Sequence, residues 1–373
     1  MFVRAIRNQI LTRLLLLLCA LPAMASSDAP APVEDWQAII RSAPYWSSQG
    51  VYNNILDIRR WVLSESGYCS TAERHLLFDH RGAFLGYVSD ADTSEATQQR
   101  LNTLRQKLAA EGRATGWTPG DASTRGYPFA LACDQPHARL GEAVGRYLGE
   151  TASDRLWGRW DDLDFATEAA PGTLHEALLH VYDTRSEQQR LSLPLELPRY
   201  LAGMLLIESG GQIRAHSAAG ARGIMQLMPG VLGDCGVAER NHWHRLAQLD
   251  CAMKLMNRNA RILEPLIKEH FPQMPEAKRQ RLFTLLLIQA YHGGAARIER
   301  LMSDEELDGP AEYFAEHHER FSAGDIAFGM VFHNLGRDRL GLASLYYVAD
   351  VELATRALCE QPALAQTPFC KAP

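Results

Sequence analysis

The chain has 373 residues, of which 46% are hydrophobic, so it is long enough to bury the cores of about two domains. Its 44 acidic residues outnumber its 38 basic ones and no basic block is present, which excludes nucleic acid as the main partner. No stretch beyond the N-terminus is apolar over the roughly 20 residues that a bilayer requires, so we expect no transmembrane span.

The N-terminus has the three-part pattern of a secretory signal peptide. Three arginines precede the apolar run 14–18, and the small residues of "AMA" fit cleavage before Ser26. The run is too short for a membrane span, although an uncleaved anchor remains an alternative. We therefore expect removal of residues 1–25, which leaves 35 basic against 44 acidic residues in a periplasmic or secreted protein.

Residues 26–50, rich in Pro, Ala and Ser, predict a tether, and residues 51–165 predict a small α+β domain. In this domain, "HLLFDHRGAFLGYV" from His75 predicts two short strands around a turn, and "YPFALAC" predicts another strand. A capping box at Asp92–Glu95 begins a helix that ends at Gly112. The domain has no catalytic motif, and binding of a protein partner is one role left open for it.

Cysteine usage agrees with export. Six cysteines remain after removal of the signal segment, and an even number in an exported chain predicts disulfides. We favour pairs that are neighbours in sequence, while the alternative is that one or more pairs stay reduced and buried. The favoured pairs are Cys69–Cys133, Cys235–Cys251 and Cys359–Cys370.

The second half of the chain predicts helices almost throughout. We divide it into a helical connection over residues 166–189, a helical domain over 190–358 and a C-terminal tail over 359–373. Two prolines precede the first helix of this helical domain, as at a domain boundary. A shortened chain that starts near Ser186 is therefore expected to fold by itself and to keep the function of this domain. The alternative is that the N-terminal domain packs over it and completes its site.

Glu208 continues the apolar face of a predicted helix. Pro198 suits the first turn, a stripe of Leu and Met residues leads to Glu208, and two glycines then end the helix. A carboxyl on such a face is partly desolvated, which raises its pKa and suits it to donate a proton to a glycosidic oxygen. The alternative is a glutamate that points to water or pairs with Arg214 or Arg222.

Two motifs around this residue carry a family resemblance. "ES" at Glu208–Ser209 is followed by S-x-x-G-A-x-G-I-M-Q-L-M-P at Ser217–Pro229. Together they resemble the catalytic domain of the soluble lytic transglycosylases, relatives of goose-type lysozyme that cleave peptidoglycan glycan strands. "QAYHGG" at Gln289–Gly294 resembles the family's later "AYNAG", and "YYVADV" at Tyr346–Val351 its closing Tyr-Val segment. The resemblance covers roughly residues 190–355.

The chain departs from the family pattern at several positions. Ile213 stands where the family often has Pro, and His292 and Gly293 stand where it usually has Asn and Ala. The segment between the second and third motifs is also long and contains "HWH". We interpret this segment as an elaborated wall or lid of the groove, held by the Cys235–Cys251 disulfide.

The resemblance implies a mainly α protein in which a lysozyme-like helical catalytic domain follows the smaller α+β domain. It implies that Glu208 is the catalytic acid and then the base, while two glycines of the second motif let the backbone approach a sugar. The candidate substrate contacts are Ser209, Ser217, Met225, Gln226, Tyr291 and Tyr347. Met225 is also a candidate for plain core packing.

The implied reaction uses a single carboxylate. It cleaves the bond between MurNAc and GlcNAc and leaves a 1,6-anhydro-MurNAc end. It requires no metal or organic cofactor, and the histidines of the chain lack convincing ligand spacing. One alternative is a lysozyme-type hydrolase in which Asp234 or Asp250 activates water. Others are a peptidoglycan-binding module without turnover and a helical structural protein with chance similarity.

Overall fold

The computed structural model describes one continuous stretch, residues 140–334, and most of the remainder of the C-terminal part. The further described residues are 52, 53, 55, 56, 59, 63, 74–78, 84–89, 91–93, 96, 100, 103, 104, 107, 108, 110–112, 129–132, 338, 340 and 342–371. All of them belong to one compact unit that spans Trp36–Pro373. The predicted signal peptide, the tether and the Cys69–Cys133 disulfide lie outside the described residues.

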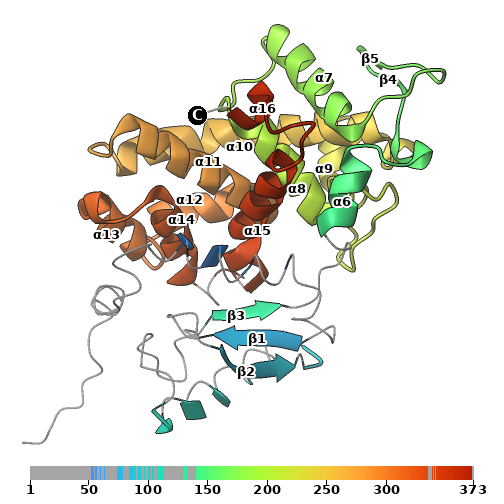
Figure 1. Ribbon diagram of the computed structural model, residues 1–373. Coiled ribbons are helices and arrows are strands. Elements are labelled where there is room, and N and C mark those ends of the chain that lie inside the picture. Colours follow the sequence, from blue (N-terminus) through green and yellow to red (C-terminus); the bar gives the residue numbers. More distant parts are fainter. Residues whose placement is uncertain are drawn as a thin grey trace, which may run out of the picture. The chain divides into compact units, whose positions relative to one another are not determined.

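The protein is mainly helical, as the sequence predicts (Figure 1). The α-helices are α6 (Leu140–Tyr147), α7 (Leu174–Glu187), α8 (Leu197–Ser209), α9 (Pro229–Asp234), α10 (Arg245–His270), α11 (Glu276–Gly293), α12 (Ala295–Ser303), α13 (Gly309–Glu316), α14 (Ala323–Phe332), α15 (Leu342–Cys359) and α16 (Pro368–Lys371). Single 3-10 turns are η2 (Ala152–Asp154), η3 (Glu239–Asn241) and η4 (His318–Arg320).

Short antiparallel strands form two sheets in the described part of the chain. The strands β1 (Arg74–Phe78), β2 (Phe84–Ser89) and β3 (Phe129–Ala132) pair in the order β2-β1-β3, which confirms the strands predicted from "HLLFDHRGAFLGYV" and "YPFALAC". The hairpin of β4 (Gly158–Trp160) and β5 (Leu163–Phe165) was not predicted. Its strands have three residues each, too few for a recognisable alternation of apolar and polar side chains.

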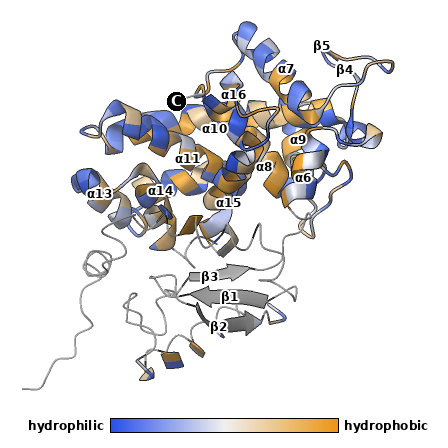
Figure 2. Ribbon diagram, viewed as in Figure 1, coloured by the Kyte–Doolittle hydropathy of each residue, from blue (hydrophilic) through white to orange (hydrophobic). Residues whose placement is uncertain are grey.

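Helix α8 is the buried centre of the helical body. Almost all of its side chains are buried, and Figure 2 shows it largely in the orange of hydrophobic residues, whereas outer helices such as α13 carry blue hydrophilic residues. As predicted, a proline lies in its first turn, and Gly210, in the left-handed conformation (φ 57°), ends it. Glu208 therefore lies in the last turn of a buried helix.

Helices α8 and α15 pack in close contact because α8 has a glycine at the point where they meet. A Cβ atom on Gly203 would lie 2.6 Å from the carbonyl oxygen of Val351 and would also clash with the Thr355 hydroxyl. The side chain of Thr355 in turn donates to the Arg199 carbonyl oxygen (3.3 Å). This close contact fixes the positions of α8 and α15, which carry the candidate catalytic groups.

The first described residues are anchored to α14 and α15. The backbone N–H of Tyr52 donates to Asp325 (2.9 Å) and its hydroxyl donates to Glu352 (2.8 Å). The guanidinium of Arg59 contacts both carboxylate oxygens of Asp350 at 2.5 Å. Burial raises the pKa of Asp350, and Arg59 opposes this rise. The segment near residues 52–59 thus contributes polar partners to the helical body.

The two predicted disulfides that fall within the described residues are formed. Cys235 at the end of α9 is bonded to Cys251 on α10, and Cys359 at the end of α15 is bonded to Cys370 on α16. The first bond closes the segment that contains "HWH", and the second attaches the C-terminal turn to α15.

Replacement of both Cys235 and Cys251 by Ser is expected to lower the free energy of unfolding by about 3 kcal/mol, because the unfolded chain regains the entropy of the closed loop. Urea unfolding measures the loss, and the pair Cys359→Ser and Cys370→Ser, which opens a shorter loop, provides the matched control. Thiol counting on the unreduced native protein should find neither Cys235 nor Cys251 free. A free thiol at either position would contradict this pairing.

Candidate active site

Glu208 is a half-buried carboxyl in the last turn of α8. Burial raises its pKa from 4.5 to about 7, and a hydrogen bond from Tyr347 opposes this rise. The Tyr347 hydroxyl donates to Oε1 of Glu208 at 2.6 Å. Neither Arg214 nor Arg222 forms an ion pair with Glu208 in the described part of the chain, and Arg222 instead contacts Glu239 (3.4 Å) and His242 (2.9 Å). The carboxyl is thus held by a neutral donor, a state in which it can carry a proton near neutral pH.

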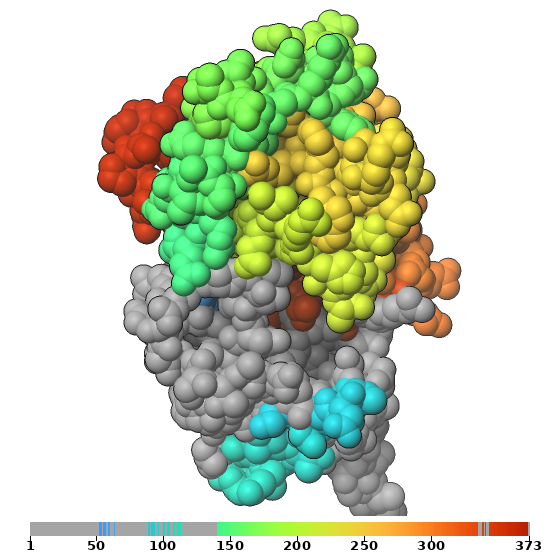
Figure 3. Space-filling view, turned by 90° about the vertical axis from the view of Figure 1, so that its right-hand side faces the viewer, coloured from blue at the N-terminus to red at the C-terminus, as the bar shows by residue number. Residues whose placement is uncertain are grey.

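Two tyrosines from different helices border this carboxyl. Tyr347 on α15 is only 4% exposed, and burial together with the Glu208 charge raises its pKa well above the usual value. Burial raises the pKa of Tyr291, near the end of α11, and the nearby Glu208 charge raises it further. The Tyr291 hydroxyl donates to the Met225 carbonyl oxygen (2.6 Å). The structure therefore brings together three residues that lie far apart in the sequence. In Figure 3, a red area of the C-terminal region lies recessed beneath the yellow-green segment that follows α8.

Ser209 does not offer its hydroxyl to a ligand, contrary to the predicted substrate contact. It is fully buried, donates to the Ile224 carbonyl oxygen (2.7 Å) and accepts from the Gly211 N–H (3.0 Å). Its hydroxyl thus connects the end of α8 with the loop that contains the second motif. The sequence pattern identifies Ser209 as part of the motif, but it does not distinguish a loop anchor from a sugar contact.

Gln248 fixes the loop that contains the second motif through side-chain hydrogen bonds to its backbone, and this residue was not identified from the sequence. Gln248 lies in the first turn of α10 with its side chain fully buried. Its Nε2 donates to the carbonyl oxygens of Arg222 (2.9 Å) and His242 (2.6 Å), and its Oε1 accepts from the Met225 N–H (3.1 Å). A Cβ on Gly223 (φ 76°) would lie 2.6 Å from this amide, so a glycine is required there. The only sequence signal was a glutamine within an apolar helix face.

The remaining predicted contacts divide between core and loop. Met225 is fully buried, so the core-packing alternative holds for its side chain. Gln226 is half-buried with a positive φ of 47°, and its Nε2 donates to the carbonyl oxygens of Ala215 (3.0 Å) and Gly223 (2.9 Å). Ser217 is partly exposed and accepts from the Ala221 N–H (3.0 Å) within a turn. Gln226 and Ser217 therefore lie on the loop beside Glu208, with much of their hydrogen-bonding capacity used to shape it.

The two aspartates considered as a second catalytic acid have other partners. Asp250 is 1% exposed and contacts Arg185 (2.7 Å) and Lys254 (2.8 Å), while Trp160 donates to it at 3.2 Å. Its pKa stays below the usual value because these hydrogen bonds and charges outweigh the effect of burial. Asp234 is largely exposed and lies 3.5 Å from Arg258. Neither carboxylate is a partly buried group free to activate water.

The described residues contain no group of three or more His, Cys, Asp or Glu side chains arranged to hold a metal ion. Within the same residues, no helix is both long and apolar enough to cross a membrane.

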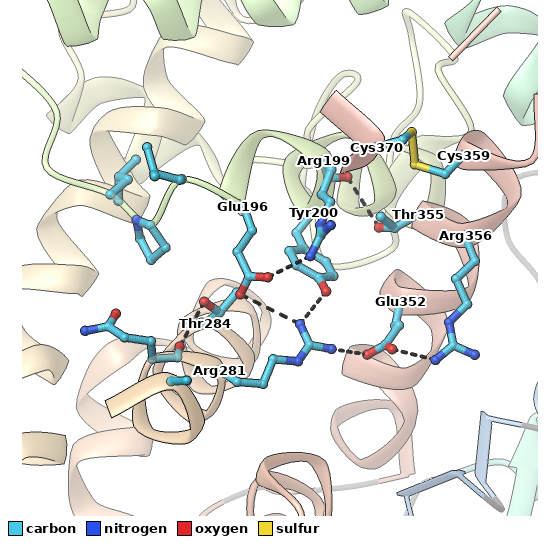
Figure 4. A pocket seen from close by; sticks show the side chains of 15 residues that line it. Glu196, Arg199, Tyr200, Arg281, Thr284, Glu352, Thr355, Arg356, Cys359 and Cys370 are labelled. Atoms are coloured by element: carbon cyan, nitrogen blue, oxygen red, sulfur yellow. Dashed lines mark hydrogen bonds and ion pairs between the residues drawn. A yellow bond between two sulfur atoms is a disulfide. The ribbon is translucent and has the colours of Figure 1, made fainter. Parts of the chain in front are cut away.

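At the other end of α8, a pocket of about 860 Å³ contains a network of charged residues (Figure 4). Arg281 on α11 lies at its centre, where it contacts Glu352 on α15 (2.6 Å), the Tyr200 hydroxyl and Glu196 (3.8 Å). Glu352 also pairs with Arg356 (2.7 Å). The network joins α8, α11 and α15, the helices that carry Glu208, Tyr291 and Tyr347, so it helps to fix their relative positions.

A scan against models of known protein families finds no match to this chain, and a search of curated proteins finds no similar sequence.

Tyr347→Phe is expected to raise the pKa of Glu208 further, by about one unit, because the lost hydrogen bond stabilises the carboxylate while burial persists. An NMR titration of the Glu208 side chain measures the shift. Tyr346→Phe serves as the matched control, since the ring of this neighbouring tyrosine faces Arg59 instead. An unchanged Glu208 midpoint in Tyr347→Phe would show that the hydrogen bond does not control this carboxyl.

Proposed function

We propose that the protein is an exported lytic transglycosylase that cleaves the bond between MurNAc and GlcNAc in peptidoglycan and leaves 1,6-anhydro-MurNAc ends. The observation that carries the proposal is Glu208, a half-buried carboxyl whose pKa is raised to about 7 and which accepts a hydrogen bond from a buried tyrosine. It is the first residue of "ES" and precedes the loop of the second motif, and these are the two elements on which the resemblance to this family rests. In this proposal, a lysozyme-like fold comprises residues 190–358 and the smaller N-terminal domain has an accessory role.

The proposed reaction moves one proton out of Glu208 and one back. The protonated carboxyl donates to O4 of the GlcNAc leaving group as the bond to C1 of MurNAc breaks. The N-acetyl group of the substrate stabilises the positive charge at C1. The C6 hydroxyl of MurNAc then bonds to C1, and its proton returns to the Glu208 carboxylate. No water is consumed, and the enzyme regains its starting state.

The surroundings of Glu208 favour this route over hydrolysis. Glycosidases that hydrolyse their substrate ordinarily use two carboxylates, one of them to activate water or to attack C1. Two aspartates were considered for this second role. Asp250 is buried in an ion pair, and Asp234 is exposed. A single carboxyl that serves as both acid and base agrees with these positions.

Export is part of the proposal. The disulfides Cys235–Cys251 and Cys359–Cys370 favour an oxidising compartment, and the basic and apolar N-terminal segment is typical of a signal peptide. We therefore propose the periplasm or the cell exterior as its location, where peptidoglycan strands are accessible.

Product analysis tests the reaction. Purified protein is incubated with isolated peptidoglycan, and the released fragments are examined by mass spectrometry with and without borohydride reduction. We expect fragments that are lighter by one water than the hydrolysis products and that resist reduction, because an anhydro end has no free C1. Reducible ends would instead identify a lysozyme-type hydrolase. Binding to peptidoglycan without any released fragment would identify a binding module.

A further inference from the structure

His292 lies at the end of α11, next to Tyr291, where its ring stacks on that of Tyr347. The two ring centroids are 4.5 Å apart and the planes are inclined by only 22°. His292 is exposed to solvent, whereas Tyr347 is 4% exposed. The imidazole is therefore part of what separates the tyrosine ring from water.

The cover over Tyr347 also affects Glu208. Tyr347 is the residue that donates to the Glu208 carboxyl, at 2.6 Å. If the imidazole were absent, one face of the phenol would be open to solvent. Water would then approach both groups, and solvation favours the charged form of a carboxyl.

We propose that His292 is a positioning residue whose ring covers Tyr347 and so limits the access of water to the Glu208 carboxyl. The inference rests on the proposed role of Glu208 as the acid, and it concerns a position at which this chain departs from the family pattern. His292 acts through Tyr347 and is not assigned a contact with the reacting atoms.

The electrostatics around these rings agree with a neutral cover. Partial desolvation and the positive charge of Arg297 on α12 lower the pKa of His292, so the imidazole is uncharged at neutral pH. The groups that face Glu208 in the described part of the chain are Tyr347 from α15 and Tyr291 from α11, both neutral. An uncharged imidazole adds no positive charge that would favour the Glu208 carboxylate.

Three substitutions in the full chain test whether His292 covers Tyr347 or makes a polar contact with substrate. They are His292→Ala, His292→Phe and His292→Asn. NMR titration of the Glu208 carboxyl without substrate is the first measurement. We expect its midpoint to fall by about half a unit or more in His292→Ala and His292→Asn, which lack a ring, and to stay at the wild-type value in His292→Phe. The second measurement is the pH dependence of peptidoglycan cleavage. Its alkaline limb, where Glu208 loses its proton, should move to lower pH in the same two variants only.

Each outcome decides the inference. An unchanged Glu208 midpoint in His292→Ala overturns it. A wild-type profile in His292→Asn, with a raised KM but an unchanged midpoint in His292→Phe, also overturns it and identifies a polar contact with substrate. If His292→Ala fails to fold, the comparison of the Phe and Asn variants still decides. A midpoint shift in a protein that cleaves no peptidoglycan would support the positioning role while rejecting the proposed function.

Discussion

Glu208→Gln is expected to lower the rate of peptidoglycan cleavage by about 10²- to 10⁴-fold, the usual contribution of general acid–base catalysis. Glutamine has the shape of the carboxyl and can still accept the hydrogen bond from Tyr347, so the site should keep its geometry. It cannot deliver a proton to the leaving oxygen or take one from the C6 hydroxyl. Release of soluble fragments from labelled peptidoglycan measures the rate.

Glu239→Gln is the matched control, because the same change is made at a side chain that is 83% exposed on η3. It should leave the rate within about twofold of the wild type, as expected for a change at an exposed side chain. A folded Glu208→Gln variant that cleaves at nearly the wild-type rate would exclude Glu208 as the acid.

Glu208→Gln should also make the protein more stable than the wild type at alkaline pH. The pKa of Glu208 rises from 4.5 to about 7 on folding, so the native state holds the proton more tightly than the unfolded state. The free energy of unfolding therefore falls as the pH rises from 4.5 to 7, and above 7 the cost is about 3 kcal/mol. Glu208→Gln removes this cost. Urea unfolding at pH 8 should show the variant to be more stable than the wild type, and the difference should vanish at pH 4.

The sequence predicts local features of the site better than its long-range contacts. Position on a helix face and two terminal glycines were enough to predict a desolvated Glu208 at the end of α8, and proximity along the chain was enough to predict the Cys235–Cys251 bond. The hydrogen bond between Tyr347 and Glu208 joins residues 139 positions apart. It depends on the packing of α15 against α8 at Gly203, which no periodicity in either segment reveals.

Roles of polar residues in the core were the least predictable. Ser209 and Gln248 both carry groups suited to bind a sugar, yet both are fully buried and hold the backbone of the loop next to the site. A buried polar side chain must satisfy its hydrogen bonds within the protein, and which backbone groups serve as partners depends on the tertiary fold. The sequence therefore indicates that such residues matter without indicating whether they face the substrate or the core.

The sequence predicts that a catalytic domain folds independently from near Ser186. The contacts of the residues before Ser186 indicate instead that the domain needs them. Arg185, the residue before this start, is 1% exposed and pairs with Asp250 on α10 (2.7 Å). It also contacts Asp162 (2.5 Å), which belongs to the segment between β4 and β5. Helices α6 and α7 add buried side chains to the same core that contains α8 and α10. Residues from about 140 to 187 are therefore expected to be part of what the helical body requires to fold.

We expect a chain shortened to start at Ser186 to fail to fold, and one that starts at residue 138 to fold. The shorter chain lacks the side chains that α6 and α7 add to the core, and Asp250 keeps Lys254 but loses Arg185. Loss of this much buried apolar surface exceeds the stability of a typical domain. Both chains should carry Asp350→Asn, because Arg59, which contacts Asp350, is absent from both. Circular dichroism and thermal unfolding measure the difference. Cooperative unfolding of the chain that starts at Ser186 would show that α6, α7 and Arg185 are dispensable, and it would restore the domain boundary predicted from the sequence.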